Sequence, residues 1–166
     1  MRVLGIDPGT RLTGWAVVEA QGPRLRACAA GVIRAGAKQP LPARLAKIEA
    51  GLVELLDAHA PAVVAVEDIF FAKYANAALK LGHARGVVLL VAEKAGLPVH
   101  EYPPALVKRT VAGRGAASKE QVAQLVGALL GLKVLPSVDA TDALAIAVTH
   151  LHAARSRGRA LGKRRA

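Results

Sequence analysis

The feature that most constrains the fold is a change of pattern near residue 34. Before it, three apolar segments over residues 2–6, 13–20 and 25–33 are separated by turns too short to hold a helix. Segments of this kind pair as an antiparallel meander. After it, helix-like and strand-like segments alternate. Residues 62–67 are apolar up to a final acid, which is typical of a buried parallel strand.

The spacing of apolar residues predicts the remaining elements. Helices are expected over 41–59, 76–95, 105–111, 119–130 and 139–154, and a fifth strand over 99–102. The order β-β-β-α-β-α-β-α-α-α indicates an α/β fold, in which helices flank both faces of one five-stranded mixed sheet. The length of 166 residues suits a single domain over residues 1–152, followed by a basic, disordered tail over 153–166.

The net charge indicates a polyanionic partner. The chain has 23 Lys and Arg against 12 Asp and Glu, a formal net charge of +11. Such a surplus favours binding to nucleic acid, because basic side chains gain by releasing the counterions of phosphates. A ribosomal role, a membrane-surface role or simply a basic surface are the alternatives. Six of the basic residues lie within residues 155–166, where they would add phosphate affinity without sequence preference.

Several classes of protein are excluded by composition. The longest uncharged apolar stretches are shorter than the roughly 18–20 residues that a membrane span needs. The opening residues lack the layout of a secretion signal. A single cysteine, Cys28, excludes an internal disulfide and a cysteine-based zinc site. We therefore expect a soluble protein of a reducing cytoplasm.

Four carboxylates stand where an α/β protein places its active site, beyond the ends of strands. Asp7 closes the first strand and Glu67 the fourth, while Asp139 and Asp142 share one face of the last helix. Clustered carboxylates repel one another, so the cluster predicts hard cations such as Mg²⁺ or Mn²⁺. Two such ions can drive a phosphodiester displacement. Each acid also has an ordinary explanation, as a turn residue, a solvated strand end or a helix cap.

Four motifs, in this order, resemble one known family. They are Gly-Ile-Asp-Pro-Gly-Thr at 5–10, Glu67-x-x-Phe70-x-Ala72-Lys73, Ala-Leu-Lys-Leu-Gly-x-Ala-Arg-Gly at 78–86 and Asp-Ala-Thr-Asp-Ala-Leu-Ala-Ile-Ala at 139–147. Over residues 2–152 the chain closely resembles the RuvC family of bacterial Holliday-junction resolvases, which have a ribonuclease H-like fold.

The resemblance implies a mechanism and partners. It implies that Asp7, Glu67, Asp139 and Asp142 bind two Mg²⁺ or Mn²⁺ ions per active site. It also implies a homodimer whose two sites nick opposite strands of a four-way junction symmetrically, with water as nucleophile and 5′-phosphate products. The implied partner is the RuvA–RuvB branch-migration complex.

The resemblance also indicates residues that contact DNA. Phe70 matches the family's aromatic near the junction centre, where it would stack on an unpaired base, and Phe71 and Tyr74 are weaker candidates. Lys108 and Lys119 match basic positions near the site. Arg114, in a glycine loop, and Lys73 are further candidates. For each lysine or arginine, an ordinary solvated charge is the alternative.

Two further expectations concern neighbouring positions. Ala78, Gly82 and Gly86 recur every four residues, which suits either a dimer seam or packing of the helix against its own sheet. Asp68 directly follows Glu67 and, by strand alternation, should point to the opposite face.

Three other functions compete with junction resolution. A YqgF-like nuclease of the same fold, acting on RNA, shares the opening motif. An actin-like ATPase or sugar kinase needs a second lobe, for which the chain is too short. A non-catalytic junction-binding module would not need four converging acids, since acids repel phosphate.

Overall fold

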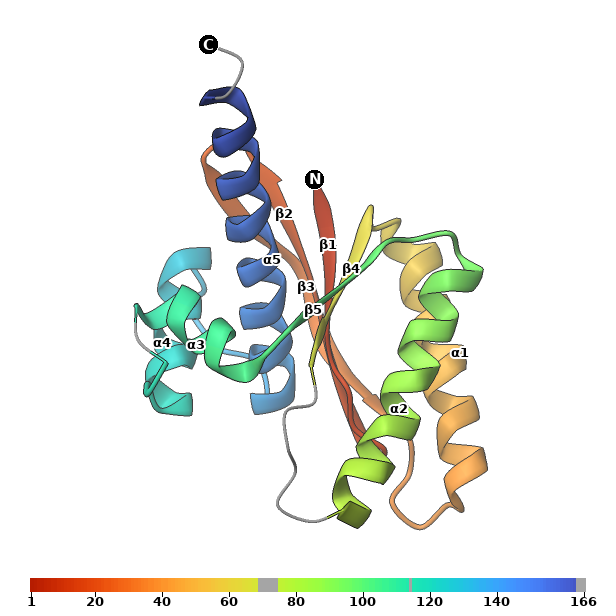
Figure 1. Cartoon of the computed structure of the whole chain (residues 1–166). Coiled ribbons are helices and arrows are strands. Elements are labelled where there is room, and N and C mark those ends of the chain that lie inside the picture. Colours follow the sequence, from red (N-terminus) through yellow and green to blue (C-terminus); the bar gives the residue numbers. More distant parts are fainter. Residues whose placement is uncertain (69–74, 114, 164–166) are drawn as a thin grey trace.

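The computed structural model describes residues 1–68, 75–113 and 115–163, with 75–77 and 158–163 described as backbone only (Figure 1). Its centre is a five-stranded sheet in the order β3-β2-β1-β4-β5. The strands are β1 Arg2–Asp7, β2 Leu12–Gln21, β3 Arg24–Arg34, β4 Val63–Glu67 and β5 Val99–Tyr102. β1, β2 and β3 form the antiparallel meander, and β4 and β5 join β1 in parallel. The predicted mixed sheet is confirmed.

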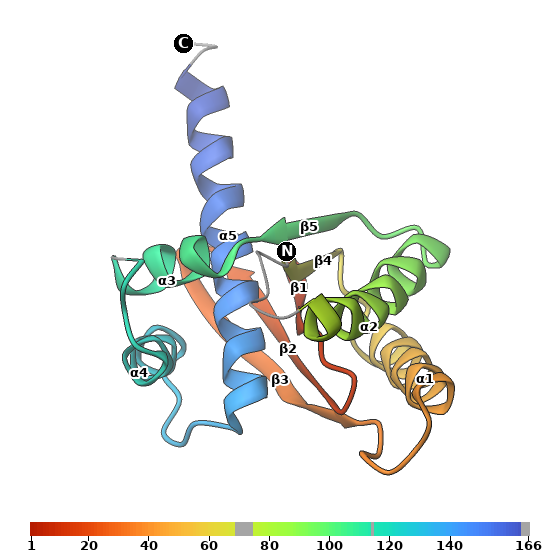
Figure 2. The same cartoon turned by 60° about the horizontal axis from the view of Figure 1, so that its bottom comes forward.

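The helices form a layer on each face of the sheet (Figure 2). They are α1 Leu41–His59, α2 Ala75–Lys94, α3 Pro104–Ala112, α4 Lys119–Leu130 and α5 Val138–Lys163. α1 and α2 cover one face, and α5 covers the other with α3 and α4 beside it. Among the described residues, no helix is both long and apolar enough to cross a bilayer.

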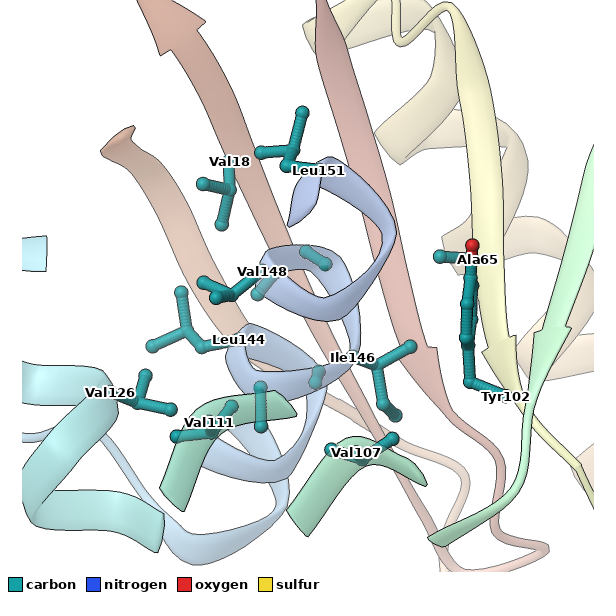
Figure 3. Close-up of a cluster of buried hydrophobic side chains, with 14 of the residues drawn as sticks. Val18, Ala65, Tyr102, Val107, Val111, Val126, Leu144, Ile146, Val148 and Leu151 are labelled. Carbon is teal, nitrogen blue, oxygen red and sulfur yellow. The ribbon is translucent and has the colours of Figure 1, made fainter. Parts of the chain in front are cut away.

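Strand alternation gives each face its own apolar core. Val3 of β1 belongs to the cluster under α5, whereas its neighbours Leu4 and Ile6 belong to the cluster under α1 and α2. Figure 3 shows the first cluster, where Leu144, Val148 and Leu151 of α5 lie against the sheet. The two cores fix α5 and α2 on opposite faces of β1 and β4.

Two glycines let α5 lie unusually close to the sheet. A Cβ at Gly5 of β1 would stand 2.3 Å from the carbonyl oxygen of Ala143. A Cβ at Gly14 of β2 would stand 2.0 Å from the carbonyl oxygen of Asp139. Any side chain at these positions would push the helix away. The lack of a side chain at Gly5 and Gly14 therefore lets the first turns of α5 lie directly against the sheet.

The last helix differs from the prediction. It was expected to end at Ala154 before a disordered tail, but α5 continues to Lys163. Arginine and alanine favour helix, and extending a formed helix needs no new nucleation. The extension is also held in place, because the Arg155 guanidinium donates to the carbonyl oxygens of Gly22 at 2.7 Å and Pro23 at 3.1 Å in the β2–β3 turn. Whether residue 152 ends the domain stays a prediction.

Candidate functional site

The strand topology brings two of the four carboxylates to one edge of the sheet. β1 and β4 are parallel neighbours whose register pairs Ile6 with Val66. The next residue in each strand is the acid, so Asp7 and Glu67 lie side by side at the carboxyl ends of the strands. This is the edge toward the bottom of Figure 1.

Helix α5 brings the other two acids to the same edge. Asp7 pairs with Gly14 across the β1–β2 ladder, and Gly14 lies directly under the backbone of Asp139. The first turn of α5 is thereby held over the end of β1. Asp142 is one turn further along the helix and shares its face with Asp139.

The pKa values show that the acids act on one another. Burial, with smaller contributions from the charges of Glu67, Asp142 and, least, Asp139, raises the pKa of Asp7 to about 7 against an opposing effect of Lys119. The pKa of Glu67 is also raised, first by burial and then by Asp142. Residues from β1, β4 and α5 therefore form one electrostatic cluster.

Two lysines face the cluster from α3 and α4. Ser118 caps α4 in a reciprocal pair with Gln121, which fixes Lys119 as the first helical residue. The Lys119 ammonium donates to Asp142 Oδ2 at 2.8 Å, and this hydrogen bond raises the pKa of the lysine. The charge of Lys108 lowers the pKa of Glu67. Both lysines line a cleft of about 270 Å³ together with Glu67 and Asp142.

The donor set suits a hard divalent cation in its chemistry. All four side chains offer carboxylate oxygens, and the charges of the other three acids contribute to the raised pKa of Asp7, a repulsion that a bound cation would relieve. In the described part of the chain, however, no three His, Cys, Asp or Glu side chains form a group that could hold a metal ion as they stand. Asp142 is turned to Lys119 instead. An ion would have to draw the carboxylates together.

The other predicted positions divide into two groups. Phe70, Lys73 and Arg114, with Phe71 and Tyr74, lie outside the described residues. Asp68 points to the α2 face, as expected, where it pairs with Arg85 of α2 at 3.7 Å.

Sequence reasoning missed the supporting contacts around the site. Gly14 carried a signal, since a glycine inside a strand often marks the close approach of another backbone. No sequence pattern indicated the contact between Tyr102 and His150. The two side chains join β5 to α5 across the core, with the hydroxyl 2.9 Å from Nδ1, and the ring of His100 lies 4.8 Å from that of His150 between centroids.

We expect the buried His150 to make stability depend on pH. Burial, with the charges of His100 and Arg157, lowers its pKa from 6.5 to about 4. Because the unfolded state binds a proton at this histidine more readily than the folded state does, the folded protein loses stability as pH falls from about 6.5 to 4. We expect a loss of roughly 3 kcal/mol. His150→Gln, which keeps a polar partner for Tyr102, should remove this part of the pH dependence in urea unfolding. An unchanged pH profile would contradict it.

Comparisons with known proteins agree on one family. The family model described as "Crossover junction endodeoxyribonuclease RuvC" matches residues 3–150. A relative of that name from Sorangium cellulosum is 56% identical over 154 residues, which are 93% of this chain and 86% of the relative. Another from Azorhizobium caulinodans is 49% identical over 152 residues, covering 92% of this chain and 90% of the relative.

Solved structures agree with these matches. One is described as T. thermophilus RuvC in complex with Holliday junction substrate. It is 42% identical with a TM-score of 0.89, covering 94% of this chain and 96% of that one. The yeast mitochondrial Holliday junction resolvase Ydc2, at 16% identity, has a TM-score of 0.63 over 89% of this chain and 77% of its own, and shows the shared fold alone. On the family match, the identities and the shared architecture, the chain belongs to the RuvC family of crossover junction endodeoxyribonucleases.

Proposed function

We propose that the chain is a structure-selective endodeoxyribonuclease that resolves Holliday junctions by two symmetric, metal-dependent hydrolytic nicks. The observation that carries the proposal is the coupling of Asp7 to Glu67, Asp142 and Asp139 at one sheet edge, in a protein of net charge +11. The solved T. thermophilus RuvC, to which this chain is 42% identical, is in complex with a Holliday junction substrate.

The four acids would hold two Mg²⁺ or Mn²⁺ ions. When bound, such ions activate water and stabilise charge on the attacking and leaving oxygens of a phosphodiester. Asp7 and Glu67 supply oxygens from the rigid sheet edge, and Asp139 and Asp142 supply them from α5. The raised pKa of Asp7 gives a proton that leaves readily near neutral pH as the cation arrives.

The two lysines have a separate task. Lys108 and Lys119 line the cleft with Glu67 and Asp142, so they can reach a phosphate that binds in this cleft. Lys119 holds Asp142 while no phosphate competes. With DNA and metal bound, its ammonium is free to donate to a phosphate oxygen, where it stabilises the charge that develops in the transition state.

Replacing Lys119 should therefore slow the chemistry more than it weakens binding. For Lys119→Met we expect a loss of about 10²-fold in the cleavage rate at saturating protein, with junction affinity changed by less than about threefold. Single-turnover kinetics and gel-shift titration in Ca²⁺ measure the two quantities. Lys133→Met, which removes an exposed lysine from the loop after α4, is the control for net charge. Equal rates in both variants would exclude this role for Lys119.

A homodimer is part of the proposal, and α2 offers a surface for it. Among the described residues, a Cβ at Gly82 or Gly86 would meet nothing within 4 Å, so these two positions do not pack against the described part of the sheet. Leu79 and Leu90 beside it are 67% and 52% exposed. Of the two expectations for this stripe, we therefore propose the dimer seam rather than packing against its own sheet. Light scattering of Gly86→Arg against wild type would test it, with a monomer expected for the variant.

The remaining family features also stay proposals. They are contacts of Phe70, Lys73 and Arg114 with DNA, the RuvA–RuvB complex as partner, and a cytoplasmic location. None of them rests on a contact among the described residues.

A substrate panel tests the function. An end-labelled four-way junction, a linear duplex and an RNA·DNA hybrid are incubated with and without Mg²⁺ or Mn²⁺. Cutting of the junction alone, and only with metal, is expected. Cutting of the hybrid would move the chain to the YqgF-like alternative, and tight junction binding without cutting would make it a binding module.

A further inference from the structure

A second charged cluster lies next to Glu67, on the α2 face of the sheet. Arg85 of α2 forms ion pairs with Asp68, at 3.7 Å, and with Glu101 of β5. The arginine side chain is only 18% exposed, and its Nε is buried without a hydrogen-bond partner among the described residues. One partly buried guanidinium therefore serves two carboxylates.

The two acids occupy the ends of neighbouring strands. Asp68 directly follows Glu67, and its backbone N–H donates to the carbonyl oxygen of Tyr102 at 3.0 Å. Glu101 pairs with Val66, and Tyr102 pairs with Glu67, in the β4–β5 ladder. Arg85 thus ties the ends of β4 and β5 together next to Glu67, whose side chain lies on the other face of the sheet.

This connection matters because β5 is a short edge strand. It has four residues, Val99–Tyr102, and the described part of the sheet ends with it. Short ladders are weak without packing or side-chain contacts across the strands. Without Arg85, Asp68 and Glu101 would face one another as like charges, which would push the two strand ends apart.

Another ion pair on the same helix provides a contrast. Lys94 of α2 pairs with Glu49 of α1 at 3.1 Å, but its side chain is 62% exposed. Exposed pairs of this kind contribute little to stability, and this one joins two helices at the end of α2 away from the strand ends. The Arg85 cluster differs in its burial, in its double partnership and in its place beside Glu67.

We propose that Arg85 is a positioning residue for Glu67, which by holding Asp68 and Glu101 together fixes the strand end that presents this carboxylate to the metal site. The proposal rests on the proposed function, since it needs Glu67 to be a metal ligand. Its specific content is that a residue on the opposite face of the sheet sets the metal affinity of the site.

The test compares Arg85→Met with Lys94→Met, two variants that each remove one cation from α2. Mn²⁺ binding to the free protein is measured by electron paramagnetic resonance, and junction cleavage is measured across a range of Mg²⁺ concentrations. For Arg85→Met we expect Mn²⁺ affinity to fall about tenfold and the Mg²⁺ concentration for half-maximal cleavage to rise by a similar factor. Excess Mg²⁺ should restore most of the maximal rate. Lys94→Met should match wild type in both.

Further variants separate positioning from folding. Arg85→Lys should recover part of the Mn²⁺ affinity, because a cation is restored without the two-pronged guanidinium. If Arg85→Met does not fold, Glu101→Gln serves instead, since it breaks one pair and should shift Mn²⁺ affinity in the same direction. Unchanged Mn²⁺ affinity in a folded Arg85→Met, or in Glu101→Gln, would overturn the proposal. Failure of wild type to bind Mn²⁺ or cut would instead overturn the proposed function.

Discussion

Asp7→Asn is expected to bind a four-way junction like wild type and to cut it at least about 10³-fold more slowly. Asp7 is the carboxylate at which the other three converge, so its oxygens are central to any metal held there. Asparagine keeps the size and one oxygen but lacks the charge that binds a divalent ion. Gel shift in Ca²⁺ and cleavage in Mg²⁺ measure the two effects. Wild-type-like cutting by this variant would remove Asp7 from the metal site.

The same variant should be more stable than wild type when no metal is present. The folded-state pKa of Asp7 is about 7 against 3.8 for the free side chain, so the folded protein resists ionisation of this group. The cost of ionising it in the folded state is absent below pH 3.8, grows as pH rises, and is complete above about 7. In EDTA, the melting temperature of Asp7→Asn should exceed that of wild type at pH 8 and approach it at pH 4. A lower value at pH 8 would contradict the electrostatic account.

Gly14→Ala should damage both the fold and the site. The added Cβ would stand 2.0 Å from the carbonyl oxygen of Asp139, a backbone atom that cannot turn aside. Overpacking of this kind costs roughly 1–3 kcal/mol, and a clash with backbone belongs at the upper end. The first turn of α5 can relieve it only by moving away from β2, and Asp139 and Asp142 would move with it.

Urea unfolding and Mn²⁺ binding measure these two consequences. Gly115→Ala is the control, because a Cβ there lies 3.5 Å from its nearest neighbour, which is ordinary contact. We expect the control to match wild type in both measurements. Gly14→Ala should lose stability and bind Mn²⁺ weakly. Wild-type Mn²⁺ affinity in Gly14→Ala would show that the Gly14 contact does not place α5 over the site.

Much of this architecture follows from short-range patterns. The turns after Asp7 and Gln21 are too short to hold a helix and favour hairpins, and the apolar run ending at Glu67 is typical of a buried strand. Once β1 and β4 are parallel neighbours, the meeting of Asp7 and Glu67 is a consequence of topology. The place of Asp142 follows from its spacing to Asp139 on one helix face. These parts of the site could therefore be predicted from the sequence.

The contacts that support the site could not be predicted in this way. Arg85 meets Asp68 and Glu101 only because three separate elements pack at one place, and no local pattern records that. The same holds for Arg155, which donates hydrogen bonds to carbonyl oxygens of the β2–β3 turn. These partners are separated from it by 131 to 133 positions in the sequence. Charge in the tail suggested disorder, but helix propagation and this anchor extend α5 to Lys163.

The most direct test of the central claim maps cleavage on all four strands of a junction. Each strand is labelled in turn, and the junction is incubated with the protein in Mg²⁺ or in EDTA. The account predicts nicks only in Mg²⁺, at symmetry-related positions on two opposite strands, with 5′-phosphate ends that a ligase can reseal. Nicks in EDTA, or equal cutting of all strands and of a linear duplex, would contradict it.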